Sequence, residues 1–126
     1  MHKSRLGGLI IDCEGDDLDA AAAFWSQALG YPAGETVTED AGRFRSLQAP
    51  PDEVQVELQN VDHPSRVHID IETDDLEAEV ARLEKLGAMQ VARVRDWCVM
   101  QAPSGHRFCV VKPQRKSFEQ SANVWE

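Results

Sequence analysis

The stretch Ile10-Ile11-Asp12-Cys13-Glu14-Gly15-Asp16-Asp17-Leu18 decides the fold, because it returns 58 positions later as His68-Ile69-Asp70-Ile71-Glu72-Thr73-Asp74-Asp75-Leu76. Six of these nine positions are identical in the two copies, and matching alanines continue the likeness further along the chain. Self-similarity at a fixed offset is the sequence signature of a repeated structural unit. The chain is therefore predicted to consist of a duplicated module.

Each copy opens with a strand and continues into a helix. Residues 6–13 and 66–71 are short β-branched runs, and in the second run Val67, Ile69 and Ile71 alternate with polar residues. The acidic pair after each run suits a helix start, so helices are predicted at residues 17–29 and 75–86. Their apolar residues recur at helical spacing and are expected to pack on the sheet.

Three more strands are predicted after each helix, separated by turn residues such as those at 39–42 and 103–105. Their ranges are 33–38, 42–48 and 54–60 in the first module, and 89–94, 97–101 and 106–112 in the second. The order is thus βαβββ twice, an α+β fold. We expect one domain, with module one at about 6–61 and module two at about 66–113.

The two ends of the chain are expected to lie outside the modules. His2 is assigned to a mobile terminus, and residues 114–126 form a polar tail with isolated Phe118 and Trp125. Two positions for this tail stay open, one on a partner chain and one on the protein's own surface.

Composition excludes several partners and locations. The formal net charge is −9, which argues against nucleic acid and anionic membranes because both select basic surfaces. No apolar run approaches the roughly 20 residues that span a bilayer. The three cysteines form no CxxC pair and there is no secretory signal, which is typical of reduced thiols in a cytoplasmic protein.

Three motifs follow one another along the chain: Ala23-Phe24-Trp25 before Leu29-Gly30-Tyr31, then Arg66-Val67-His68-Ile69-Asp70-Ile71, and finally Ala102-Pro103-Ser104-Gly105-His106. Together they resemble the glyoxalase-like subgroup of the vicinal oxygen chelate superfamily, which also includes bleomycin resistance proteins and extradiol dioxygenases. The resemblance implies two modules whose mixed sheets curl into a cup, with the helices outside and the chemistry on the concave face. It also implies a homodimer, which would cover exposed sheet edges.

Strand alternation indicates which side chains line such a cup. If the apolar sets pack on the helices, the opposite faces carry polar residues from the first, fourth, fifth and eighth strands. The predicted ligand-binding residues are Asp12, Gln55, Glu57, His68, Asp70, Arg107 and Cys109. Concave faces with a few convergent polar groups are the usual sites of small-molecule binding.

The resemblance also implies four metal-ligand positions, which correspond here to Ile10, Glu57, His68 and Cys109. Ile10 cannot coordinate a metal, and Cys109 replaces the usual glutamate. We therefore expect no bound metal and no glyoxalase I activity, since that reaction needs a metal to polarise its carbonyl. If a metal binds, the expected ligands are Glu57, His68 and Cys109.

Two functions stay open at this point. The first is a metal-free protein that binds a small molecule in the cup. The second is an enzyme, either a metal-dependent lyase, isomerase or dioxygenase, or one in which Glu57 and His68 act as an acid–base pair. The loss of a ligand at Ile10 favours the first function, and the survival of both Glu57 and His68 favours the second.

Overall fold

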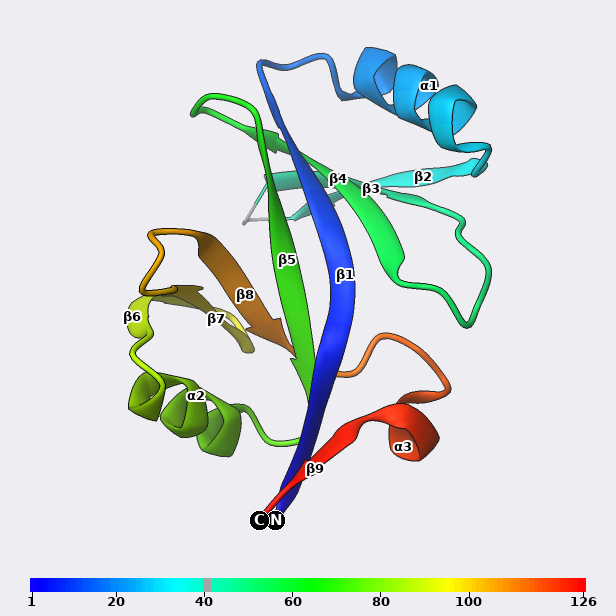
Figure 1. The fold of residues 1–126 in the computed structure, drawn as a ribbon. Coiled ribbons are helices and arrows are strands. Elements are labelled where there is room, and N and C mark those ends of the chain that lie inside the picture. The colour runs from blue at the N-terminus through cyan, green and yellow to red at the C-terminus, as the bar shows by residue number, and fades with distance from the viewer. Residues whose placement is uncertain (40–41) are drawn as a thin grey trace. The chain divides into compact units, whose positions relative to one another are not determined.

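The computed structural model describes residues 1–39 and 42–126 as an α+β fold (Figure 1). The turn predicted at 39–42 contains Asp40 and Ala41, which lie outside the described residues. The chain divides into two compact units, one formed by Gly8–Val67 and the other by Met1–Gly7 with His68–Glu126. Strand β1 (His2–Glu14) contributes its second half to the first of these units and its first half to the other.

The unit Gly8–Val67 contains one βαβββ module. After β1 come α1 (Leu18–Leu29), β2 (Ala33–Glu39), β3 (Gly42–Leu47) and β4 (Gln55–Val61). The strands are hydrogen-bonded in the order β2-β3-β4-β1, with β1 and β4 parallel and the other pairs antiparallel. One face of this sheet packs on α1 through a core of Leu18, Ala22, Leu47, Val56 and Leu58.

The other unit repeats the module. Its elements are β5 (Arg66–Thr73), α2 (Leu76–Lys85), β6 (Met89–Val94), β7 (Trp97–Gln101) and β8 (Arg107–Val111). The order is β1-β5-β8-β7-β6, and β5 and β8 are parallel. Its core consists of Val80, Leu83, Cys98, Met100, Phe108 and Val110. The prediction of two βαβββ modules is confirmed.

Both helices begin where the acidic pairs end. The side chain of Asp17 accepts a hydrogen bond from the Ala20 backbone N–H at 3.0 Å, and Asp75 accepts one from Ala78 at 3.1 Å. Each aspartate thus caps a helix, so α1 and α2 start one residue later than predicted. Gly30 ends α1 in the left-handed conformation with φ 75°, as glycine allows without steric cost.

Both ends of the chain form strands of the sheet. Strand β1 begins at His2, four residues before the predicted start, so the assignment of His2 to a mobile end was wrong. The tail forms helix α3 (Phe118–Ser121) and strand β9 (Asn123–Trp125), and β9 pairs antiparallel with the first residues of β1. The tail therefore docks on the protein's own surface, one of the two positions left open.

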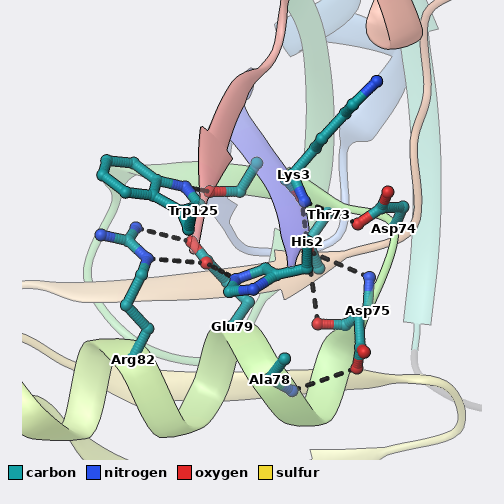
Figure 2. Close-up of polar contacts among 10 residues, drawn as sticks. His2, Lys3, Thr73, Asp74, Asp75, Ala78, Glu79, Arg82 and Trp125 are labelled. Carbon is teal, nitrogen blue, oxygen red and sulfur yellow. Dashed lines mark hydrogen bonds and ion pairs between the residues drawn. The ribbon is translucent and has the colours of Figure 1, made fainter.

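A buried carboxylate joins the N-terminus, the C-terminus and α2 (Figure 2). Glu79 on α2 is fully buried and accepts hydrogen bonds from His2 Nε2 at 2.7 Å and from Arg82 at 2.8 and 2.9 Å. The Trp125 ring lies over the Arg82 guanidinium at 3.8 Å, and its Nε1 donates to Ser4 Oγ at 2.8 Å. These contacts stabilise a charge that burial alone would penalise.

Within the described residues, no helix combines the length and the apolar character that crossing a membrane requires.

Candidate functional site

In the unit Gly8–Val67, the polar face of the sheet is the one that points away from α1. Val56 and Leu58 on β4 pack on α1, so Glu57 between them lies on the opposite face. Parallel register pairs Ile10 with Glu57 and Asp12 with Gln59, which places Ile10 and Asp12 on this face too. The sequence assigned Asp12, Gln55 and Glu57 to one face, and the strand register agrees.

Two of the carboxylates on this face have partners on neighbouring segments. Asp12 is 1% exposed, and its carboxylate forms an ion pair with Arg66 Nε at 3.4 Å. Glu57 accepts a hydrogen bond from Ser46 Oγ at 3.3 Å on the neighbouring strand β3. Ile10, at the position that the family resemblance assigns to a metal ligand, is 4% exposed beside Glu57. An apolar side chain thus stands where a donor atom would be needed.

In the other unit, the polar face of β5 and β8 again points away from the helix. Ile71, Phe108 and Val110 pack in the core below α2, so residues of the opposite parity face the other way. These are His68 and Asp70 on β5, with Arg107 and Cys109 on β8, and Asp70 lies directly opposite Cys109 in the register.

One expectation about β5 was wrong in part. The apolar set of this strand was expected to be covered by the helix, yet Val67 is 59% exposed and Ile69 is 40% exposed. Helix α2 has ten residues, about 15 Å, and only Ile71 at the far end of the strand packs against its core. The alternation predicted the faces correctly but could not predict how far the helix reaches.

Three candidate residues converge on the polar face of β5 and β8. One potential ligand atom each from His68, Asp70 and Cys109 lies within 4.8 Å of the others, and His68 Nε2 is 3.7 Å from Asp70 Oδ1. The His68 and Asp70 side chains are only 11% and 17% exposed. Arg107 is exposed and donates from Nε to Gln101 Oε1 at 2.9 Å.

The structure thus brings His68 and Cys109 together and adds Asp70 to them, while Glu57 belongs to the other unit. Sequence reasoning placed Asp70 among the ligand-binding residues but not among the possible metal ligands. The available signal was the spacing His68-x-Asp70, since residues two apart on a strand project from the same face.

Comparison with known proteins identifies the family. The model of the glyoxalase-like domain matches residues 8–111, most of the chain. This chain belongs to the glyoxalase-like domain family. No curated protein matches the sequence of this family member.

Solved structures share the fold of this glyoxalase-like chain at low sequence identity. Methylmalonyl-CoA epimerase from Mycobacterium tuberculosis is 18% identical with a TM-score of 0.69, and the match covers 88% of this chain and 89% of the epimerase. A methylmalonyl-CoA epimerase in complex with methylmalonyl-CoA and NH4+ is 16% identical with a TM-score of 0.68, covering 87% and 95%. A variant of the Streptomyces coelicolor epimerase with bound 2-nitronate-propionyl-CoA is 16% identical with a TM-score of 0.67, covering 87% and 98%.

The other two cysteines of this glyoxalase-like chain serve in packing. Cys13 packs against the core below α1, and burial, followed by the nearby charge of Asp12, raises the pKa of its thiol. Cys98 is fully buried in the core below α2, where burial raises its pKa as well. A raised pKa disfavours the thiolate that acts as nucleophile or metal ligand. Cys109 is therefore the cysteine to consider for chemistry on the polar face.

The remaining histidines have partners outside the candidate site. His63 Nδ1 lies 2.9 Å from the Pro64 carbonyl oxygen, and His106 Nδ1 lies 2.7 Å from Ser104 Oγ. His2 is bound to Glu79. None of these three contacts involves His68, Asp70 or Cys109.

Proposed function

We propose that this glyoxalase-like chain binds a small carboxylate-bearing molecule on the polar face of β5 and β8, without a resident metal. His68, Asp70, Arg107 and Cys109 are its contacts. The observation that carries the proposal is the convergence of His68, Asp70 and Cys109, which are largely shielded from water although they lie on the sheet face opposite the helix. Small-molecule binding sites are typically lined by a few such convergent polar groups.

Charge favours an anionic ligand. The chain carries a formal net charge of −9, yet Arg5 and Arg115 both bind the Glu72 carboxylate, and Arg107 donates to the neutral amide of Gln101. With Asp70, the ligand face and its end hold three arginines and two carboxylates. Three positive charges against two negative ones leave a surplus of one positive charge. An arginine fork suits the two oxygens of a carboxylate, and Arg107 uses only its Nε in its described hydrogen bond.

The structural neighbours support this ligand class. Methylmalonyl-CoA and 2-nitronate-propionyl-CoA are bound by epimerases of the same fold, and both compounds carry an anionic oxygen group on a short acyl unit. For this chain we propose a ligand that resembles only the short anionic unit of these compounds. Ligand binding by Asp12, Gln55 and Glu57, on the face of β1 and β4, stays a prediction from the sequence.

A second candidate function is metal-dependent lyase, isomerase or dioxygenase chemistry, favoured by the same triplet. Histidine nitrogen, carboxylate oxygen and cysteine sulfur are all zinc ligands, and three protein ligands with an open position are typical of catalytic zinc. The donor types fit, and ligand atoms within 4.8 Å of one another need only small side-chain movements to reach a common ion. A zinc-class ion held by His68, Asp70 and Cys109 would polarise a ligand carbonyl.

Saturation-transfer NMR with acetate, propionate and methylmalonate tests the first candidate. We expect at least one acid to bind, with an affinity reduced about tenfold or more in His68→Ala and in Arg107→Ala, because charge-assisted hydrogen bonds contribute about 1.5–3 kcal/mol. Arg93→Ala is the matched control, since Arg93 lies on the edge strand β6 and pairs with Glu77. Equal binding in all four proteins, or none in the wild type, would contradict the proposal.

Two further properties are proposals from the sequence. We propose a homodimer, supported by the long exposed edge strands β2 and β6. Light scattering should then give about 28 kDa, twice the 14.0 kDa of one chain, and 14.0 kDa at micromolar concentration would contradict it. We also propose a cytoplasmic location, supported by three thiols that form no disulfide with one another.

A further inference from the structure

A third polar residue follows His68 and Asp70 on the same face of β5. Glu72 is fully buried, and the same strand parity places its side chain on their side of the sheet. Gly7 on the neighbouring strand β1 leaves the space that this side chain fills, since a Cβ at Gly7 would come within 3.0 Å of Glu72 Cβ. The face therefore continues past Asp70 to a buried carboxylate.

The C-terminal segment covers this carboxylate. Glu72 Oε1 accepts a hydrogen bond from the Gln114 backbone N–H at 2.7 Å. Glu72 Oε2 accepts one from Arg5 Nε at 2.6 Å and another from Arg115 Nη2 at 3.3 Å. The chain leaves β8 at Val111, which pairs with Glu72, and turns directly over the end of the face.

Other contacts hold the segment in this position. Arg115 also donates to the Leu6 carbonyl oxygen and is 7% exposed at its side chain. Phe118 is 3% exposed, and the Arg5 guanidinium lies 5.6 Å from the centre of its ring. Arg5 Nη2 donates to Ser117 Oγ at 3.2 Å. A segment anchored by two charged contacts and a buried aromatic ring forms a fixed boundary.

The boundary stands close to the candidate site. Residues two apart on a strand are separated by about 6.6 Å along it, so Asp70 lies about that distance from Glu72, and Cys109 lies about as far from Val111. The match to the glyoxalase-like domain ends at residue 111, so the segment lies outside the matched residues.

We propose that residues 114–118 form the end wall of the ligand face on β5 and β8, and that this wall limits the length of a molecule bound along His68 and Asp70. The inference rests on the proposed function for its ligand, but the position of the wall can be tested without any ligand.

Alkylation of Cys109 by N-ethylmaleimide, quantified for each cysteine peptide by mass spectrometry, measures access to the face. Arg115→Ala removes the side chain that closes the wall and should raise the rate at Cys109 at least threefold. The rate at Cys13, which lies in the other unit, should stay unchanged. Arg115→Lys should restore a rate near that of the wild type. Lys116→Ala is the matched control, since Lys116 is the exposed neighbour, and it should have no effect.

An unchanged Cys109 rate in folded Arg115→Ala would overturn the wall. So would a parallel rise at Cys13 and Cys109, because that would report general loosening of the protein. Saturation-transfer NMR with malonate and the longer glutarate tests whether the wall limits the length of the ligand. Arg115→Ala should improve the binding of glutarate relative to that of malonate. A faster Cys109 reaction without binding of any acid would support the wall and overturn only the carboxylate ligand.

Discussion

Replacing Glu79 with glutamine is expected to lower the free energy of unfolding at pH 7 by about 2–3 kcal/mol. Glu79 is fully buried and holds Arg82 with two hydrogen bonds and His2 with one. The amide keeps the shape of the side chain but leaves the Arg82 charge without its counter-charge. The loss should stay below the largest values for broken buried pairs, because the Arg82 side chain is still 25% exposed.

The effect of Glu79→Gln should depend on pH. Burial by itself would raise the pKa of Glu79, but hydrogen bonds from Arg82, Ser4 and His2 outweigh burial and bring the pKa below its ordinary value of 4.5. A lowered pKa in the folded state contributes stability that is fully present above pH 4.5 and is lost as the pH falls through the folded value. Urea unfolding at pH 7 and pH 3 should therefore show a smaller difference between wild type and variant at pH 3.

Glu77→Gln is the control for this experiment. Glu77 lies on the same helix and pairs with Arg93 at 2.7 Å, but its side chain is 74% exposed. Exposed ion pairs contribute about 0–1 kcal/mol, so this variant should be close to the wild type. Similar losses in Glu77→Gln and Glu79→Gln would contradict a special role for the buried carboxylate.

Replacing Phe118 with alanine is expected to destabilise the protein by about 3 kcal/mol. Phe118 is 3% exposed, and its ring packs below the Arg5 guanidinium, so the truncation leaves a cavity between the tail and β1. It should also weaken the pairing of β9 with β1, because α3 leads directly into β9. Thermal and urea unfolding measure the change.

Phe24→Ala provides the comparison for Phe118. Phe24 lies on α1 and is 62% exposed, so its loss should cost about 1 kcal/mol or less. If Phe118→Ala were as stable as Phe24→Ala, burial of the Phe118 ring would not stabilise the fold as expected. Hydrogen exchange of the Asn123–Trp125 amides measures whether Phe118→Ala also weakens the pairing of β9 with β1.

The repeat determined how much of the fold could be predicted. Identical acidic pairs, helical spacing and turn residues act locally, so both modules and both capping aspartates follow from the sequence. The docked tail does not follow, because Trp125 binds Ser4 across 121 positions and Phe118 stands alone in a polar segment. Such contacts have no periodic signal, and they also turn His2 from a free end into a strand residue.

The site was predictable to a similar extent. Alternation and family resemblance selected His68 and Cys109, and the parity rule placed Asp70 beside them. The distances among their ligand atoms depend on the parallel register of β5 and β8, which the sequence does not specify. The cover over Glu72 depends on the backbone N–H of Gln114. Every residue except proline carries this donor, so the residue types in the sequence do not predict the contact.

Metal-free binding of a small carboxylate at His68 is tested most directly by saturation-transfer NMR before and after dialysis of the protein against EDTA. The probes are acetate, propionate and methylmalonate, and elemental analysis of the same samples gives the metal content. The prediction is that binding persists unchanged in the metal-free wild type and is weakened about tenfold or more in metal-free His68→Ala. Binding that disappears with EDTA and returns with Zn²⁺ in the wild type, but not in His68→Ala or Cys109→Ala, would contradict it and establish the metal-dependent alternative.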